Sequence, residues 1–144
     1  MSRKLDDLGL AIKNVQWRHH RALDIQLTRL GISLVQWNAL REIDRNPGSS
    51  SHGLAELTFN SDQAFGTLTT RLLRRGFIDR QSGAGRAITH RLTESGRVML
   101  SKGQEIRQRV LAASFAPLSQ EERTTLSRLL TKLLIHPLSD SHHS

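Results

Sequence analysis

Apolar residues recur at steps of three and four along the N-terminal part of the chain. One stripe on a helix collects Leu5, Leu8, Ile12, Val15, His19, Leu23, Leu27 and Leu30. Because this spacing matches one face of a helix, the pattern predicts a single long helix over residues 3–30. Leu10 and Trp17 fall about a third of a turn or more away from the stripe. A helix with two apolar faces needs two surfaces to bury them, and we expect the second surface to belong to another subunit.

A second, shorter helical pattern follows directly. Gly31 ends the first helix, and the pair Ser33 and Gln36 has the spacing of a capping box that starts the next one. The apolar positions of this second helix are Trp37, Leu40 and Ile43. A loop of Asn, Pro, Gly and Ser begins at residue 46 and predicts where the helix stops.

The next two helical patterns are joined by a very short link. Residues 52–57 predict a short helix whose apolar side chains face inward, namely Leu54, Ala55 and Leu57. A second helix is predicted over residues 62–75, capped by Ser61 or Asp62 and ended by Gly76. Two short helices joined so tightly are typical of a helix-turn-helix.

The remaining sequence predicts a hairpin and two more helices. Residues 77–81 and 87–92 have the alternation of strands, with a Gly-containing turn over residues 82–85. Thr93 caps a helix through about residue 113, and the pair Ser119 and Glu122 predicts a capping box for the last helix. That helix carries Leu126, Leu129, Leu130, Leu133 and Leu134. The polar residues 137–144 are expected to be a disordered tail.

Composition narrows the class of partner. The chain has 144 residues, which predicts one domain, and its net charge of +8 comes from seventeen Arg and four Lys against thirteen acids. Arginine presents a planar fork that suits phosphate oxygens and guanine edges, so this choice favours nucleic acid. A generally basic surface or Arg-rich codon usage would give the same total. The sequence contains no cysteine, and its apolar runs and N-terminus predict neither a membrane span nor a signal peptide, so we expect a cytoplasmic protein.

The predicted helix over residues 62–75 separates into two faces. One arc is mainly apolar and holds Phe65, Leu68, Thr69, Leu72 and Leu73. The opposite arc carries amide, hydroxyl and guanidinium groups: Gln63, Thr67, Thr70, Arg71 and Arg74. These groups match base edges and phosphates, and an ordinary solvated face would include acids for ion pairs. We therefore predict that this arc, together with Ser61, Ala64 and Gly66 at the start of the helix, contacts double-stranded DNA.

The hairpin extends the basic surface. Residues 71–92 contain six arginines and one acid, Asp79. Arg86 lies just after the predicted turn and is expected to reach the DNA backbone or minor groove, with Arg80 beside it. Gly66 should destabilise its helix by about 1 kcal/mol relative to Ala. Either a close approach to DNA or tight packing inside the protein would explain it.

At this point the chain resembles the MarR family of winged-helix regulators. The resemblance is carried in order by Gly31-Ile32-Ser33-x-x-Gln36-Trp37, Leu54-Ala55-Glu56-Leu57, Leu72-x-x-x-Gly76-Phe77-Ile78-x-Arg80, Arg86, Leu92-Thr93-x-x-Gly96 and Leu118-Ser119-x-Glu121-Glu122. It covers about residues 5–136 of the sequence. It implies a mainly α fold with a small β-hairpin wing, in which residues 1–136 form one domain and 33–92 form the winged helix-turn-helix lobe. The segments 3–30 and 93–136 would then be dimerisation helices.

The resemblance also implies partners. It predicts a homodimer on a pseudo-palindromic operator, usually a repressor, often released by a small aromatic ligand. Residues expected in the dimer interface are Leu5, Leu8, Leu10, Ile12, Leu126, Leu129, Leu130 and Leu133. Residues expected to line an effector pocket are Trp17, His19, Trp37 and Met99. One departure is Ala84, where the family commonly has an Asp that orients the wing arginine.

Other classes of function fit less well. The sequence has no His-Glu-x-x-His, no Gly-x-Ser-x-Gly and no glycine-rich phosphate loop, so we expect no enzyme, no metal site and no cofactor. His19, although placed in the pocket, also fits an ordinary histidine bonded within a core or interface. The remaining alternative is a winged-helix module that binds protein, or an architectural DNA-binding protein without a specific operator.

Overall fold

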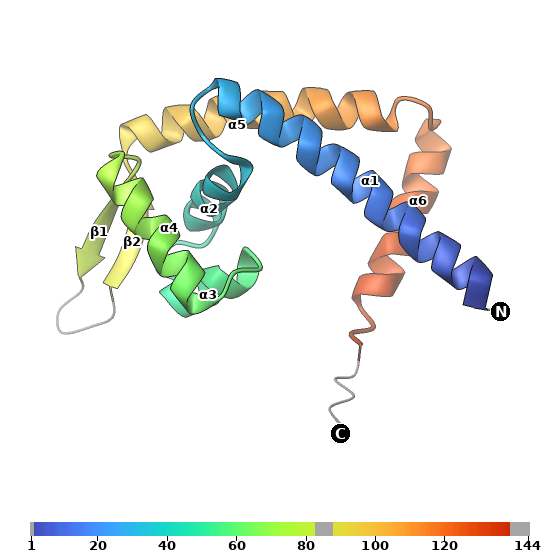
Figure 1. The fold of residues 1–144 in the computed structure, drawn as a ribbon, viewed down its shortest axis with the longest axis horizontal. Coiled ribbons are helices and arrows are strands. Elements are labelled where there is room, and N and C mark those ends of the chain that lie inside the picture. The colour runs from blue at the N-terminus through green and yellow to red at the C-terminus, as the bar shows by residue number, and fades with distance from the viewer. Residues whose placement is uncertain (1, 83–87, 139–144) are drawn as a thin grey trace. The chain divides into compact units, whose positions relative to one another are not determined.

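A computed structural model describes residues 2–82 and 88–138 of the chain. The chain packs as two compact units, residues 1–110 and 111–144. Eight elements follow in the predicted order: α1 (Ser2–Arg29), α2 (Leu34–Arg45), α3 (Ser51–Leu57), α4 (Asp62–Arg74), β1 (Ile78–Ser82), β2 (Ile88–Leu92), α5 (Glu94–Phe115) and α6 (Gln120–Leu134) (Figure 1). The predicted tail and the predicted hairpin turn lie mostly outside the described residues.

Serine side chains start four of the helices. The Oγ atoms of Ser33, Ser50, Ser61 and Ser119 each accept a hydrogen bond from a backbone N–H in the first turn, at 3.0–3.1 Å. At Ser119 the predicted capping box is complete, because Glu122 Oε1 also accepts from the N–H of Ser119 at 2.9 Å. These bonds satisfy N–H groups that a helix leaves unpaired at its N-terminus.

The capping box predicted at Ser33 is only half formed. The cap itself is present, but the side chain of Gln36 does not return to it. Instead, Gln36 Oε1 accepts a hydrogen bond of 2.9 Å from Arg75 Nη1, at the end of α4. The same guanidinium also donates to the carbonyl of Gly31 and lies over the ring of Phe77 at 4.7 Å. The prediction failed because a residue 39 positions away in sequence competes for the amide.

The core of unit 1 joins α1 to the helix-turn-helix. The largest fully buried side chains are Trp37, Phe65, Leu27, Ile32, Leu40, Leu54, Leu72 and Ile78. The C-terminal half of α1 contributes Leu23 and Leu27 to this core. Leu57, predicted to face inward, is 47% exposed because it is the last residue of α3 and the apolar contacts of that helix come from Leu54 and Ala55.

Two glycines let α5 approach the rest of unit 1 closely. A Cβ on Gly96 would lie 2.1 Å from the carbonyl oxygen of Phe77, and a Cβ on Gly103 would lie 1.9 Å from Trp37 Nε1. Between them, the carbonyl of Leu100 accepts a 3.2 Å hydrogen bond from that indole nitrogen. Because no side chain fits at either glycine, this face of α5 packs directly against Phe77, the residue before β1, and against Trp37 of α2.

The two strands form an antiparallel hairpin that follows α4. Its register pairs Ile78 with Leu92, Asp79 with Arg91, Arg80 with His90, Gln81 with Thr89 and Ser82 with Ile88. The turn between α3 and α4 is tight and places Phe59 at a φ of 59°. Gly31 and Gly76 close α1 and α4 with φ of 92° and 76°, which glycine adopts without steric cost. Within the described residues, no helix is long and apolar enough to cross a membrane.

Candidate nucleic-acid interface

The outer face of α4 is open to solvent along its whole length. Phe65, Leu68 and Leu72 hold the helix to the core, whereas every residue predicted for the opposite arc is exposed. The exposed positions are Gln63, Ala64, Gly66, Thr67, Thr70, Arg71 and Arg74, with the capping residue Ser61 in front of them. The predicted arc therefore exists as one continuous polar surface, which we call the α4 face.

The threonine hydroxyls of the α4 face donate their protons to backbone carbonyls of the same helix. Thr67 Oγ1 donates to the carbonyl of Gln63 at 3.1 Å, and Thr70 Oγ1 donates to that of Gly66 at 2.9 Å. A hydroxyl has one proton to donate, so these two side chains present acceptor lone pairs and methyl groups outward. Donors on this face come from the amide of Gln63 and the guanidinium groups of Arg71 and Arg74. The face can thus accept from base amino groups, contact thymine methyls and donate to acceptors or phosphates.

Gly66 has open space where a side chain would stand. No atom lies within 4 Å of an added Cβ, so the protein's own packing does not require glycine here. Of the two explanations open from the sequence, internal packing is therefore wrong in this structure. The observation leaves room for an external surface to approach the backbone of α4.

The first turn of α4 also holds an acid that the α4 face otherwise lacks. Asp62 is exposed, and its carboxylate is 2.9 Å from Nδ1 of His52 on α3. His52 Nε2 lies 3.0 Å from Glu56 Oε1 on its own helix. No local pattern in the sequence predicts this group, because His52 and Asp62 come together only across the helix-turn-helix.

The wing carries exposed arginines and one buried histidine. Arg80 and Arg91 are both exposed, on β1 and β2 respectively. Arg91 stands opposite Asp79 in the register, so an acid faces it, whereas Arg80 stands opposite His90. Arg80 therefore has no acid opposite it in the hairpin, and its charge is available to a phosphate. Arg86 and Ala84 lie outside the described residues.

His90 is the buried partner of that pair. Neither ring nitrogen has a hydrogen-bond partner within the described part of the chain. Burial lowers the pKa of His90 below its ordinary value of 6.5, and the positive charge of Arg80 lowers it further. Both effects favour the neutral form of His90.

Arg75 belongs to the scaffold rather than to the interface. Its bonds to Gly31 and Gln36 tie the end of α4 to the start of α2. In the sequence Arg75 is one of two adjacent arginines at a helix end, and no local signal distinguishes it from Arg74. Its partners become visible only when the two helix ends meet.

The four residues predicted for an effector pocket lie in different surroundings. Trp37 is completely buried in the core, so it presents no surface to a ligand in this structure. Trp17 is 58% exposed and stacks on His20 at 5.7 Å. Met99 is half-buried against the core. His19 is half-buried on α1, and its pKa is lowered by burial and then by the charges of Arg107 and Arg18.

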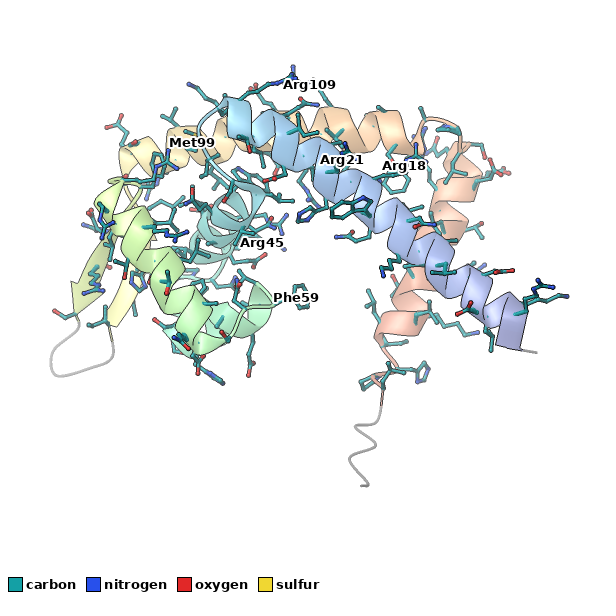
Figure 2. All side chains as sticks on the ribbon, in the orientation of Figure 1. Arg18, Arg21, Arg45, Phe59, Met99 and Arg109 are labelled. Atoms are coloured by element: carbon teal, nitrogen blue, oxygen red, sulfur yellow. The ribbon has the colours of Figure 1, made fainter. Side chains whose placement is uncertain are left out.

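Arginines gather near His19 and Trp37. Arg41 lies over the Trp37 ring at 5.3 Å, and its Nε is 3.4 Å from Glu42 Oε1. Burial lowers the pKa of Arg107 on α5, and the charges of Arg41 and Arg45 on α2 lower it further. Figure 2 shows Arg18 and Arg21 along α1 and Arg45 on α2. We call Arg18, Arg41, Arg45 and Arg107 the arginine cluster; it is a concentration of positive potential that an anion would relieve.

Apolar side chains of the predicted dimer interface are exposed. On α1 these are Leu5, Leu8, Leu10 and Ile12, and on α6 they are Leu129, Leu130 and Leu133. Leu126 is half-buried and lines an open apolar groove of about 370 Å³ within unit 2, together with Phe115, Leu130 and Leu134. A row of exposed apolar side chains along a single helix, as on α1 and separately on α6, is uncommon on monomeric proteins. Among the described residues, no group of three His, Asp or Glu side chains is placed to hold a metal ion.

Comparison with known proteins gives consistent similarities. Residues 30–87 match the model of a family described as the MarR family. The HTH-type transcriptional repressor Rv2887 of Mycobacterium tuberculosis is 28% identical over 109 residues, which make up 74% of this chain and 78% of that protein.

Solved structures are similar over most of the chain. A crystal structure of Rv2887 in complex with DNA has a TM-score of 0.72 and 25% identity, covering 88% of this chain and 96% of the other. The same protein in complex with p-aminosalicylic acid has a TM-score of 0.74 and 26% identity, with coverages of 88% and 97%. A mutant MarR from E. coli, complexed with operator DNA, has a TM-score of 0.79 at 23% identity over 91% of this chain and 96% of that one. Together with the elements described above, these structures confirm the predicted fold class, a winged helix-turn-helix with additional terminal helices.

Proposed function

We propose that the chain is a homodimeric transcriptional regulator of the MarR family, whose model residues 30–87 match, and that it binds a specific DNA operator and acts by binding rather than by catalysis. The observation that supports this most directly is the α4 face. From residue 63 to residue 74 its exposed side chains are acid-free, and they offer both donors and acceptors. The relative Rv2887 is named a repressor and has been crystallised with DNA. We propose repression as the mode of action and the cytoplasm as the location.

We propose that base recognition and backbone contact are divided between two elements. In a helix-turn-helix the second helix enters the major groove with its N-terminal residues at base edges. Gln63 and Thr67, in the first half of α4, would therefore read bases. Arg71, Arg74 and Arg80 would hold phosphates, with Arg86 at the wing.

The test is selection of bound sequences from a random DNA pool, followed by fluorescence anisotropy on the selected site. We expect a salt-sensitive and sequence-selective complex. If about six to ten phosphates are contacted, raising salt from about 50 to 200 mM should weaken binding by about 10³–10⁵-fold. Gln63→Ala should relax the selected sequence, whereas Arg80→Ala should weaken binding to all sequences alike. A pool that yields no enriched site would favour the architectural module instead.

We further propose that a small aromatic carboxylate is the effector and that the arginine cluster holds its negative charge. Rv2887 has been crystallised with p-aminosalicylic acid. In this chain the guanidinium groups of Arg41 and Arg107 are the half-buried members of the cluster, and His19 lies beside Arg107. Because Trp37 is buried, we replace it as a ligand-contacting residue by the Arg41 guanidinium that covers its ring.

Calorimetry with p-aminosalicylate as the probe tests the effector proposal. We expect binding that is lost in Arg107→Gln and retained in Arg109→Gln, since Arg109 is an exposed arginine of the same helix (Figure 2). The probe should also raise the Kd for DNA in wild type and in the Arg109 variant. Equal binding by both variants would contradict the assignment of the cluster.

A further inference from the structure

The side chain of His52 stands between two carboxylates that come from two different helices. Its Nδ1 is 2.9 Å from Asp62 Oδ1 and 3.2 Å from Oδ2, and its Nε2 is 3.0 Å from Glu56 Oε1. Asp62 is the first residue of α4, and Glu56 lies one turn along α3 from His52 itself. The three side chains are exposed, so protons exchange freely with solvent. The histidine therefore links α3 to the start of α4.

The position of His52 between two carboxylates suits its protonated, imidazolium form. An ionised carboxylate only accepts hydrogen bonds, and a neutral imidazole has a single N–H to donate. A neutral His52 can satisfy Asp62 or Glu56, whereas the imidazolium donates to both at once. Consistently, the hydrogen bond to Asp62 raises the pKa of His52 above 6.5, followed by the charges of Asp62 and Glu56. Those two acids are the charged groups that shift His52; α2, the other helix packed against α3, contributes no charge that shifts its pKa.

Because of the position of Asp62, the proton on His52 affects the charge that α4 presents to DNA. Asp62 immediately precedes Gln63 on the α4 face, at the end of the helix that enters the groove in a helix-turn-helix. A carboxylate brought close to phosphates is repelled by them. With a neutral histidine the group of Glu56, Asp62 and His52 carries two net negative charges, and with the imidazolium it carries one.

We propose that His52 is a proton-dependent bridge that neutralises the acidic start of α4, so that DNA binding takes up a proton and tightens as the pH falls. The proposal rests on the DNA-binding function proposed above. His52 acts as a positioning residue, since it works through Asp62 and not by reading a base. By linkage, DNA and the proton favour each other's binding, so the Kd for DNA falls as the pH drops from the pKa of His52 in the complex towards its lower pKa in the free protein.

The test is the pH profile of DNA affinity, measured by anisotropy from about pH 8.5 to 6.5, where one linked proton changes the Kd by at most about tenfold per unit. The pKa values of His19 and His90 are lowered below 6.5, so the midpoints of their titrations lie below this window. Wild type is expected to bind about three- to tenfold more tightly at the acid end.

Three variants separate charge from shape. His52→Gln keeps a hydrogen-bonding side chain without a charge, and its affinity should be weak and independent of pH. His52→Lys carries a permanent charge, and its affinity should be tight and independent of pH. His136→Gln removes an exposed histidine from unit 2 and should keep the wild-type profile. Circular dichroism on each variant checks that the fold is retained.

Two further measurements do not depend on absolute affinity. Calorimetry of DNA binding in two buffers with different ionisation enthalpies should show uptake of a fraction of one proton by wild type and none by His52→Gln. In the DNA-free protein, the ring of His52 followed by NMR should titrate at a lower pH in Asp62→Asn than in wild type.

The outcomes are distinguishable. If His52→Gln keeps the wild-type pH slope, or if His52→Lys binds as weakly as His52→Gln, the bridge does not act through its charge and the proposal is overturned. If wild type binds no DNA at any pH, the proposed function fails and this inference fails with it. An unchanged NMR titration in Asp62→Asn would overturn the pairing itself, whatever the DNA result.

Discussion

At the scale of single residues, replacing Gly66 should have opposite effects on protein stability and on DNA binding. An exposed helix-interior glycine with no atom within 4 Å of an added Cβ should gain about 0.5–1 kcal/mol on replacement by alanine. We expect Gly66→Ala to raise the free energy of unfolding, measured by urea denaturation, by that amount. If the backbone of α4 approaches DNA here, the added methyl should weaken DNA binding by about tenfold, or about 1.4 kcal/mol.

A matched variant makes the Gly66 result interpretable. Gly9 also lies in a helix with open space around it, so Gly9→Ala should give a similar gain in stability. It is outside the α4 face and should leave the affinity per lobe for a half-site unchanged. If Gly66→Ala binds DNA as well as wild type does, close approach at this position is wrong.

His90 predicts how the stability of the lobe depends on pH. Its folded pKa lies below the unfolded value of 6.5, so the unfolded chain binds the proton more readily. Stability is therefore fully present above about pH 6.5 and declines as the pH falls from there through the folded pKa. His19 has a shift of the same sign and contributes in the same direction.

Replacement of His90 by leucine should remove this dependence and the two unpaired ring nitrogens together. We expect His90→Leu to be about 1 kcal/mol more stable than wild type near neutral pH, since a buried unsatisfied polar group is costly. The gain should be larger near pH 5.5. Urea denaturation at the two pH values measures both effects, with the exposed His136→Gln as the control. A gain that does not grow on acidification would contradict the assignment of the buried neutral ring.

At the scale of elements, the contact between α5 and α2 depends on Gly103. An alanine there would place its Cβ against the indole of Trp37 and displace the bond from Nε1 to the carbonyl of Leu100. Overpacking of this kind typically costs about 1–3 kcal/mol, and we expect Gly103→Ala to lose about that much. In a Trp17→Phe background, the emission of Trp37 should also shift as its surroundings open.

The control for Gly103 is another small residue of the same helix. Ser101 is exposed on α5, so Ser101→Ala should change the free energy of unfolding by less than about 0.5 kcal/mol. If Gly103→Ala is as stable as Ser101→Ala, α5 has enough freedom to move away and the close contact is not rigid.

The order and bounds of the elements were predictable from the sequence because their signals are local. A serine before an apolar run marks a helix start, as Ser61 and Ser119 show, and a glycine with positive φ marks an end, as at Gly76. The two arcs of α4 follow from its own periodicity. The prediction for Leu57 was wrong because burial at a helix end depends on what packs over that end.

Features that join distant segments were not predictable in the same way. Gln36 is hydrogen-bonded to Arg75, and His52 to Asp62, across turns whose geometry cannot be predicted from the local sequence. Trp37 was placed in a ligand pocket because an aromatic residue suits both a core and a pocket; the structure places it in the core. The seven-residue spacing of Gly96 and Gly103 on α5 was the signal available for the close approach to Trp37.

At the scale of the whole molecule, the exposed apolar faces of α1 and α6 predict the oligomeric state. One chain has a mass of 16.2 kDa, and we expect sedimentation at micromolar concentration to give about twice that. Leu130→Glu combined with Leu133→Glu places charges on the apolar face of α6 and should shift the protein to the single-chain mass. Val35→Glu, which makes the same change at an exposed valine of α2, should remain dimeric.

The same variants connect oligomeric state to DNA affinity. A dimer engages two half-sites, and the second contact is made at the high effective concentration set by the first. Disrupting the dimer should therefore weaken binding to a two-half-site operator by about 10²–10⁴-fold and leave binding to a single half-site unchanged. The monomeric variant should then bind the full operator as weakly as wild type binds a half-site. If the variant becomes monomeric and still binds the full operator like wild type, the two lobes act independently, and α1 and α6 do not set the spacing of the reading helices.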